Sequence, residues 1–438
     1  NMRVVDVARL LNSTSFGFVL AQARLYREFN RVGFRIGSSE NPRNINLLKY
    51  IAWMFDRKHT PEETSGARSY EERRNAERDR QAEQSLAGRD IGPLPEVVNP
   101  DRKAACERNF QLFCESYFPE TYSLAWSPDH LKVIEKIETA VLRGGLFALA
   151  LPRGSGKTTI TESAALWSML YGHREFVVLI GATESAALEL LDSLKTELEV
   201  NERLAEDFPE VCYPVAQLEG IANRCAGQLY KGERTRITWT SNEIVLPTVE
   251  GSRASGIIVR VAGITGRIRG MKFKRSDGRS VRPSLVIIDD PQTSESAGSL
   301  EQTRKRVRVL AGDILGLAGP GQKISGIMPC TIIRPGDMAD IILNRNTHPD
   351  WNGEKTRMVY RFPTNMKLWE EYAEIRAEAL RTEGNFQKAT EFYLANREAM
   401  DAGAEVSWEA RFNHDEVSAL QHAMNLKFQD EAAFQSEY

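Results

Sequence analysis

The sequence predicts an α/β protein with a mostly parallel sheet flanked by helices, and three observations lead to that prediction. First, short apolar runs of strand length alternate with helical stretches in the middle of the chain. Second, a glycine-rich turn at residues 154–157 directly follows one apolar run and precedes a helical stretch. Third, another apolar run ends in two acids, Asp289 and Asp290. Strand ends of this kind are where α/β proteins place their polar sites.

Six apolar runs are the expected strands, because parallel strands buried on both faces carry near-continuous valine, isoleucine and leucine. The runs are residues 146–151, 176–180, 257–261, 285–288, 323–328 and 357–362. Residues 236–246 alternate around Ser241 and Asn242 in the manner of a hairpin. We therefore expect most of the sheet to be parallel, with one antiparallel addition.

Composition divides the chain of 438 residues into four parts. We expect a small helical module at 1–58, a charged helical connector at 59–104, the α/β core at 105–365 and an acidic helical segment at 366–438. Residues 1–60 hold ten basic side chains against four acids, whereas residues 369–438 hold six against fifteen. This uneven charge indicates a polyanionic partner that meets particular surfaces.

The N-terminal module has the pattern of a helix-turn-helix. Helical spacing at residues 4–11 is broken at residues 12–15, and further helices are expected at about 17–30 and 44–55. Arg24, Arg27 and Arg31 would form a basic face that contacts DNA. A small helical bundle with a solvated arginine face fits the same pattern and stays open.

Several classes of protein are excluded by composition. An apolar content of 42% with 27% charged residues describes a globular chain with a core, and no apolar run reaches the ~20 residues that span a bilayer. The five cysteines include no CxxC pair, so neither a disulfide framework nor a zinc site is indicated, and a reducing cytoplasm is expected. We expect His414 and His422 at the surface of the acidic tail.

The turn at 154–157 has the chemistry of a phosphate loop. Gly154 and Gly156 allow the backbone to curl so that successive N–H groups, together with a helix N-terminus, face phosphate oxygens. In such a loop Lys157 contacts the β- and γ-phosphates and the Thr158 hydroxyl holds Mg²⁺. The sequence therefore predicts a P-loop NTPase core. The expected ATP-binding residues are Arg153, Gly154, Ser155, Gly156, Lys157, Thr158 and Thr159.

This loop departs from the general pattern G-x-x-x-x-G-K-[ST], because Leu151 stands where the leading glycine is usual and Arg153 lies inside the loop. Its natural complement is the acidic strand end. We expect Asp289 to bind Mg²⁺ through water and Asp290 to orient or deprotonate the attacking water. Glu295, a few residues further on, is the reserve candidate for that catalytic carboxylate.

The sequences "LPRGSGKTT" at 151–159 and "RPSLVIIDDPQ" at 282–292 resemble the ATPase of the large terminase subunit of tailed bacteriophages. The segments 118–138, 266–273 and 325–343 are similar to the adenine-side segment, an Arg-Gly stretch and the coupling motif of that family. The resemblance covers about residues 110–365. It implies an ATP- and Mg²⁺-dependent motor that drives double-stranded DNA into a procapsid.

The resemblance also implies roles for single residues. Arg153 would contact the γ-phosphate or a neighbouring subunit, and Thr331, or Ser325 on the same segment, would couple hydrolysis to movement. Residues 253–282 hold nine basic side chains against one acid, a net of +8. A contact with DNA or with a neighbouring subunit is expected there, through Arg267, Arg269, Lys272 and Lys274.

The partners implied by the resemblance are viral double-stranded DNA, the portal protein, further copies of the chain in a ring of usually five, and a small terminase subunit. Such a motor works on the procapsid in the host cytoplasm, without a membrane. No strand-rich stretch follows residue 366, so we expect the family's nuclease domain to be absent from these residues. Two other interpretations stay open: another P-loop DNA translocase related to helicases, and a DNA-binding scaffold regulated by nucleotide.

Overall fold

The computed structural model describes residues 89–438 except Ser276, and it divides the chain into two compact units, residues 1–82 and 83–438. Before residue 89 it describes Met2, Arg3, Asp6, Arg9, Asn44, Ile45 and Ala52. Strand β1 (Met2–Arg3) pairs antiparallel with β2 (Asn44–Ile45). The helix expected from about Asn44 is therefore wrong at its start, because backbone pairing with β1 holds these two residues extended.

Asp6, Arg9 and Ala52 are helical, as expected for the stretches 4–11 and 44–55. The other expectations for the N-terminal module, and those for the connector before residue 89, concern residues that lie outside this description. Among them are Arg24, Arg27 and Arg31 and the helix-turn-helix arrangement itself. They stay predictions.

An eight-stranded sheet forms the centre of the second unit, in the order β14-β3-β13-β12-β4-β9-β8-β7. Its members are β3 (Leu146–Ala150), β4 (Phe176–Gly181), β7 (Thr238–Trp239), β8 (Glu243–Val245), β9 (Ile258–Gly263), β12 (Leu285–Asp289), β13 (Ser325–Cys330) and β14 (Glu354–Lys355). The strands from β14 to β9 run parallel, and β8 and β7 are added antiparallel. This confirms the α/β class, the mostly parallel sheet and the hairpin near Ser241.

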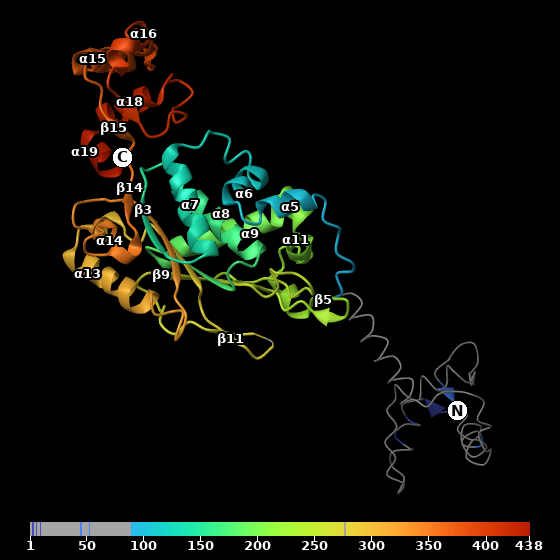
Figure 1. Cartoon of the computed structure of the whole chain (residues 1–438). Helices are drawn as coiled ribbons and strands as arrows, with labels where there is room; N and C mark the ends of the chain where they lie inside the picture. Colours follow the sequence, from blue (N-terminus) through green and yellow to red (C-terminus); the bar gives the residue numbers. More distant parts are fainter. Residues whose placement is uncertain are drawn as a thin grey trace. The chain divides into compact units, whose positions relative to one another are not determined.

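Helices cover both faces of this sheet (Figure 1). Alternate residues of β4 show why: Val177 and Leu179 pack into one apolar cluster, whereas Val178 and Ile180 pack into another on the opposite face. The first cluster is completed by α5 (Pro100–Cys106), α6 (Phe110–Tyr117), α7 (Pro128–Leu142), α8 (Lys157–Leu170), α9 (Glu184–Val200), α10 (Glu202–Asp207) and α11 (Pro209–Ala216). The second is completed by α13 (Leu300–Val309), the π-helical turn η2 (Leu310–Ile314) and α14 (Met338–Leu343).

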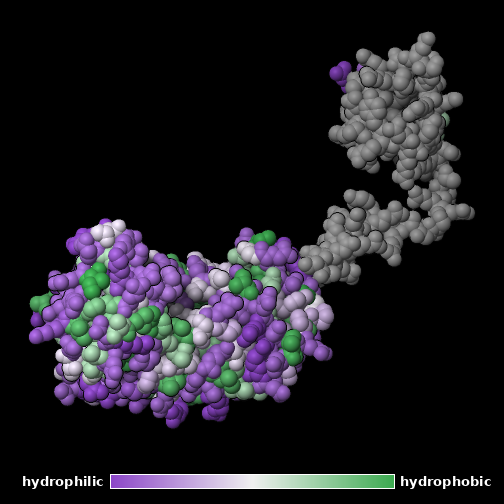
Figure 2. Space-filling model, turned by 90° about the horizontal axis from the view of Figure 1, so that it is seen from above, coloured by the Kyte–Doolittle hydropathy of each residue, from purple (hydrophilic) through white to green (hydrophobic). Residues whose placement is uncertain are grey.

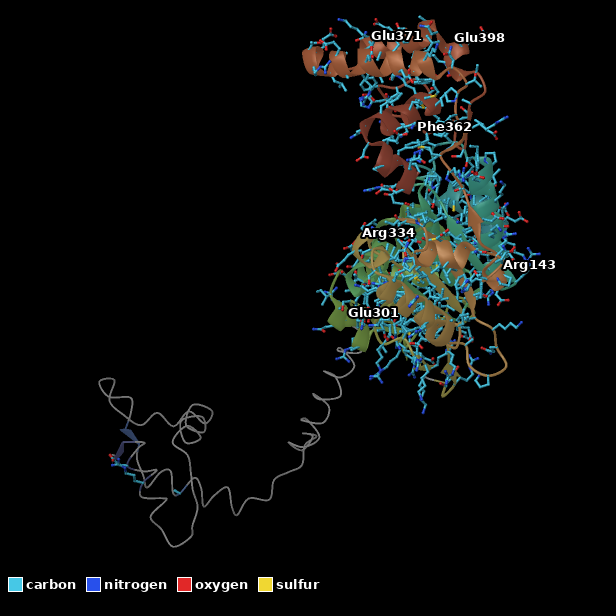
Figure 3. All side chains as sticks on the ribbon, turned by 90° about the vertical axis from the view of Figure 1, so that its left-hand side faces the viewer. Arg143, Glu301, Arg334, Phe362, Glu371 and Glu398 are labelled. Carbon is cyan, nitrogen blue, oxygen red and sulfur yellow. The ribbon has the colours of Figure 1, made fainter. Side chains whose placement is uncertain are left out.

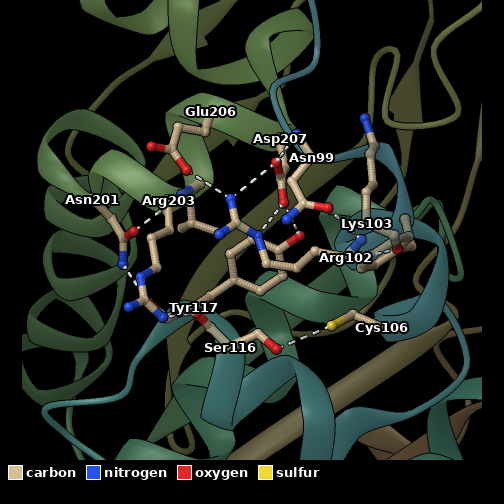
Figure 4. A network of polar contacts seen from close by, with 12 residues as sticks. Asn99, Arg102, Lys103, Cys106, Ser116, Tyr117, Asn201, Arg203, Glu206 and Asp207 are labelled. Carbon is tan, nitrogen blue, oxygen red and sulfur yellow. Dashed lines mark hydrogen bonds and ion pairs between the residues drawn. The ribbon is translucent and has the colours of Figure 1, made fainter.

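A buried ionic network attaches the start of this unit to its core (Figure 4). The Asp207 carboxylate is fully buried and accepts hydrogen bonds from the Arg102 guanidinium at 2.6 and 3.0 Å and from the Tyr117 hydroxyl at 2.7 Å. The Asn99 backbone N–H donates to it at 3.1 Å. The hydrogen bond with Asp207 raises the pKa of Arg102. Four donors thus compensate the burial of one charge and fix α5 against α10.

The C-terminal segment is helical, as predicted, and has a small core of its own built around Trp369, Tyr372, Tyr393 and Met424. Its elements are α15 (Met366–Glu383), α16 (Gln387–Ala395), α17 (Arg397–Asp401), α18 (Ala419–Gln429) and α19 (Glu431–Glu437). The expected surface position of His422 is wrong. His422 is buried, and its Nδ1 lies 2.7 Å from the Glu416 carboxylate, which supplies the polar partner that burial requires.

The strand expected at residues 357–362 also lies elsewhere than predicted. It forms β15 (Val359–Arg361), which pairs with β16 (Glu405–Val406) in a separate two-stranded sheet. Tyr360 and Arg361 are exposed, so this run does not have the two buried faces that the central sheet requires. The edge position beside β3 is taken instead by β14.

The remaining elements are short. They are η1 (Ala222–Gly227), α12 (Ser294–Ala297), η3 (Pro349–Trp351) and the hairpins β5 (Leu229–Tyr230) with β6 (Glu233–Arg234) and β10 (Phe273–Lys274) with β11 (Ser280–Val281). Hydrophilic side chains cover most of the visible face of residues 89–438, and hydrophobic ones are scattered over it (Figure 2). Within the described residues no helix combines the length and apolar character needed to cross a bilayer.

Candidate phosphate-binding site

The loop at residues 151–156 joins the end of β3 to the first residue of α8, Lys157. Gly154 and Gly156 have φ values of +75° and +74°, a region of backbone conformation that favours glycine. Gly156 is the N-cap of α8, and no side chain in the described part of the chain caps the first N–H groups of that helix. These N–H groups are therefore free to bind an anion. The strand, loop and helix occur in the order that the sequence predicts.

Three loops meet at the carboxyl edge of the sheet. Because β13 lies between β3 and β12, the loops that follow these three strands are neighbours. The Lys157 Nζ lies 2.5 Å from the Thr331 hydroxyl and 3.0 Å from an Asp290 carboxylate oxygen. The Thr158 hydroxyl donates to an Asp289 carboxylate oxygen at 3.0 Å. The residues predicted from the glycine-rich turn and from the acidic strand end thus form one cluster.

Asp289 has the surroundings of a metal-binding carboxylate. Burial and the nearby Asp290 charge raise the pKa of Asp289 to about 6, although the hydrogen bond from Thr158 opposes this shift. Its second oxygen, Oδ1, is buried and has no hydrogen-bond partner among the described residues. An unpaired buried acceptor beside a hydroxyl is a fitting donor set for Mg²⁺, which usually takes few protein ligands and completes its shell with phosphate and water.

Asp290 differs from its neighbour in both conformation and exposure. Its φ of +37° is unusual for a residue with a side chain, and its backbone N–H donates to the Pro329 carbonyl at 3.1 Å. The side chain is 40% exposed and pairs with Lys157. Its carboxylate is therefore held at the open side of the cluster, where a water molecule can reach it.

A buried polar pair joins the acidic loop to the loop after β13. The Gln292 side-chain amide donates to the Asp337 carboxylate at 2.7 Å, and the Gln292 side-chain oxygen accepts from the Met338 N–H at 2.9 Å. Asp337 is 1% exposed, is the N-cap of α14 and also accepts from the Ile333 N–H at 2.8 Å. Neither residue is among the site residues predicted from the sequence. The one local sign of this pair in the sequence is that Asp337 stands at an N-cap position before α14.

Arg153 lies outside the cluster. Its guanidinium pairs with the Glu437 carboxylate at 2.8 Å, its side chain is 67% exposed, and its backbone N–H donates to the Glu437 carbonyl at 2.9 Å. In this structure Arg153 therefore joins the loop to α19, and its expected contact with a γ-phosphate or a neighbouring subunit stays a prediction. The physical reason for its position is the ion pair with Glu437, which lies 284 positions further along the chain and is therefore not visible from the local sequence.

Two further candidates are not brought to the cluster. Ser325 is the first residue of β13 and pairs in register with Leu285, so it lies at the amino edge of the sheet, a strand's length from Asp289. Thr331, which follows β13, is the member of that segment at the cluster. Glu295 is exposed on α12, so Asp290 is the carboxylate that contacts Lys157.

Two aromatic side chains lie beside the first turn of α8. The Tyr122 hydroxyl donates to the Thr159 carbonyl at 3.1 Å and lies 2.8 Å from the Ser163 hydroxyl. The Tyr122 and Trp126 rings are 4.9 Å apart. The segment that the resemblance assigns to the adenine side thus lies next to Thr159, one of the expected ATP-binding residues.

The expected basic surface is exposed at Arg267, Arg269, Lys272 and Lys274. Arg269 pairs with Asp313, which attaches this loop to the turn after α13. Elsewhere in the stretch 253–282 much of the positive charge is neutralised: Arg253, Arg260 and Arg279 pair with Glu107, Glu243 and Asp277, respectively. The exposed basic residues Arg304, Lys305 and Arg308 of α13, which the sequence analysis did not single out, extend the surface.

Among known proteins, neither a search of family models nor a search of curated sequences finds a match to this chain. The case for a function therefore depends on the geometry of the cluster and on the resemblance of its motifs.

Proposed function

We propose that this chain is an ATPase, and that the phosphates of Mg²⁺-bound ATP occupy the edge of the sheet between the loop at 151–156 and Asp289. The observation that carries the proposal is the 3.0 Å contact between the Thr158 hydroxyl and the Asp289 carboxylate, with Lys157 directly beside it. Thr158 and Asp289 would hold the metal ion. When bound, Mg²⁺ supplies positive charge that offsets the charge of the phosphates.

Lys157 would serve as the phosphate contact. In this structure its ammonium group pairs with Asp290 and donates to Thr331. A triphosphate competes for the same ammonium group, because phosphate oxygens are strong acceptors of charge-assisted hydrogen bonds. Binding would therefore release Asp290, which could then accept a hydrogen bond from the attacking water and orient it.

Thr331 is the coupling residue in this proposal. It follows β13 and contacts Lys157, and its carbonyl accepts from Gln292 at 3.3 Å. Gln292 is in turn bonded to Asp337 at the start of α14. Movement of Lys157 toward a phosphate would thus alter contacts of both the acidic loop and the loop that leads to α14.

We further propose that hydrolysis drives translocation of double-stranded DNA, as the resemblance to terminase large subunits implies. Six exposed basic residues support a contact with phosphates. None of them pairs with an acid among the described residues, and all lie on the loop at 267–274 or on α13. They are Arg267, Lys272, Lys274, Arg304, Lys305 and Arg308. The ion pair of Arg269 with Asp313 attaches this loop to η2, which directly follows α13. The ring of subunits, the portal and the small subunit are partners that depend on the resemblance alone.

The basic surface lies away from the acidic C-terminal helices. Figure 3 labels Glu301 at the start of α13 near one end of the described part and Glu371 and Glu398 near the other. This separation favours DNA contact on the side of α13, because a polyanion is repelled from the acidic helices.

The experiment compares ATP turnover with and without double-stranded DNA and measures DNA affinity across salt concentrations. We expect DNA to stimulate ATP turnover. A plot of the logarithm of the DNA-binding constant against the logarithm of the salt concentration should become less steep by about 0.9 for each phosphate contact that is lost. Replacing Lys272, Lys274 and Lys305 by alanine should flatten that slope, whereas the control exchange of Lys367 and Arg381, exposed on α15, should not. If all variants turn over ATP at the same rate and bind DNA with the same affinity, the proposed contact with DNA is contradicted, but the proposed ATPase activity is not.

A further inference from the structure

Two donors from other parts of the chain bind backbone carbonyls of the loop at 151–156. The His130 Nε2 lies 3.0 Å from the Ser155 carbonyl oxygen, and the Arg411 guanidinium donates to the Arg153 carbonyl at 2.5 Å. His130 belongs to the first turn of α7, whereas Arg411 comes from the C-terminal segment, 258 positions from Arg153. Neither residue was singled out by the sequence analysis.

The protonation of His130 follows from its partners. Its Nδ1 faces the Ser127 backbone N–H at 3.2 Å, and a backbone N–H can only donate, so Nδ1 accepts. The Ser155 carbonyl can only accept, so Nε2 carries the proton. The ring is therefore the neutral Nε2–H tautomer. Burial lowers the pKa of His130, in agreement with this assignment.

The side chain of His130 has little freedom to move. It is 3% exposed, and the Trp408 ring lies edge-on at 4.5 Å. Trp408 is itself fixed, because its indole N–H donates to the Ala125 carbonyl at 2.7 Å. Arg411 is in the same turn, and its backbone N–H donates to the Trp408 carbonyl at 3.1 Å. One turn of the C-terminal segment thus supports both clamps.

The effect of the clamps on the loop follows from the planarity of the peptide bond. In a trans peptide the C=O of one residue and the N–H of the next point in opposite directions. Because the Ser155 carbonyl points toward His130, the Gly156 N–H points away from His130. In the same way, the Arg153 carbonyl points toward Arg411, and the Gly154 N–H points away from it. Among the described residues these two N–H groups have no hydrogen-bond partner.

We infer that His130 and Arg411 are positioning residues of the phosphate loop, which fix the peptide orientations that let the Gly154 and Gly156 N–H groups bind phosphate. The inference rests on the proposed function, because it assumes that a phosphate is bound there. It adds that the C-terminal segment is required to shape the site. Preorganised N–H donors bind an anion better than donors that must first be turned, because the cost of ordering is met during folding.

The test is a comparison of KM and kcat for ATP in matched variants. His130→Ala leaves the Ser155 carbonyl without its donor, and we expect KM to rise about tenfold, in line with the loss of a buried hydrogen bond. His130→Gln keeps an amide N–H donor and should restore KM to within about threefold of the wild type. The control is His173→Gln, because His173 is another histidine whose Nε2 donates to a backbone carbonyl, that of Glu107, at 2.8 Å.

Arg411 is tested in the same way. Arg411→Ala should also raise KM about tenfold. Arg397→Ala is the matched control, because both guanidinium groups lie over a tyrosine ring, at 5.5 Å for Arg411 and 5.9 Å for Arg397, but only Arg411 contacts the loop. A merely structural role would lower the amount of folded enzyme, and thus the apparent kcat, without changing KM.

The outcomes separate this inference from the proposed function. A wild-type protein that does not bind ATP overturns the proposed function and this assignment with it. A wild-type protein that hydrolyses ATP, with His130→Ala and Arg411→Ala unchanged in KM, overturns the assignment alone. A His130→Gln variant as impaired as His130→Ala also contradicts it, because the lost donor is then not the cause.

Discussion

Replacing Asp289 by asparagine should stabilise the metal-free protein while it abolishes ATP hydrolysis. The carboxylate is poorly solvated, has one oxygen without a partner and lies near the Asp290 charge. Its ionised form is therefore costly in the folded protein when no metal is bound. Asparagine has nearly the same shape and carries no charge, so it removes this cost, but it is a poor ligand for Mg²⁺.

The magnitude follows from the pKa of Asp289, about 6 in the folded protein against a reference value of 3.8. Above pH 6 both folded and unfolded states are ionised, and the folded state bears the full cost, about 3 kcal/mol. Between pH 6 and 3.8 the folded state takes up the proton, and the cost declines to roughly half of that value at pH 5. The stability advantage of Asp289→Asn should thus grow by about 1 kcal/mol between pH 5 and pH 8.

The assay is urea unfolding of both proteins in EDTA at a series of pH values. Taking the difference between the two proteins removes the effect of other titrating groups. Added Mg²⁺ and ATP should then raise the unfolding midpoint of the wild type but not that of the variant. A difference that is independent of pH, or that grows toward acid, would refute the description of Asp289 as a destabilised metal ligand.

Three further predictions concern neighbouring parts of the structure. Lys157→Ala should reduce ATP turnover at least about a hundredfold while the circular dichroism spectrum stays unchanged, because the lost charge acts on phosphate and not on the core; turnover within a few-fold of wild type would contradict it. Thr331→Val should leave ATP affinity within about threefold but lower turnover about tenfold, as measured by binding and steady-state kinetics, because only the hydroxyl contact with Lys157 is lost. Burial lowers the pKa of His173 to about 4, so the unfolded state binds more protons than the folded state between pH 6.5 and 4, and stability falls as the pH falls. Urea unfolding should show that His173→Gln removes up to about 2 kcal/mol of this loss at pH 5. If the free energy of unfolding depends on pH with the same slope in both proteins, this prediction is wrong.

The main elements of the fold could be predicted because their signals are local. The runs that became β3, β4, β9, β12 and β13 are continuous and apolar, as strands buried on both faces must be. β14 has only two residues and gives no periodic signal. The run at 357–362 contains apolar residues, but several residues of the run are exposed in the structure. Such short edge strands are determined by packing, which a local pattern does not contain.

The candidate site was predictable where residues follow strands. Lys157, Thr158, Asp289 and Asp290 each belong to a motif next to a strand end, and parallel strands bring such ends together. The same reasoning favours Thr331 over Ser325, since only Thr331 follows its strand.

Contacts between distant parts of the chain were not predictable in this way. The pairing of Arg153 with Glu437 and the hydrogen bond from His130 to Ser155 depend on how separate elements dock. His422 was misplaced for a related reason, because its partner Glu416 stabilises a buried position that composition alone disfavours. The N-terminal helix-turn-helix, with its three arginines, stays a prediction.

The most direct test of the central claim is a calorimetric titration of the wild-type chain with ATP, once in Mg²⁺ and once in EDTA. If the loop at 151–156 and Asp289 share one metal-bound triphosphate, ATP binds in Mg²⁺, and the affinity drops at least about tenfold when the metal is chelated. No heat of binding in Mg²⁺, or equal affinity in both buffers, would contradict the claim that these two strand ends form a nucleotide site.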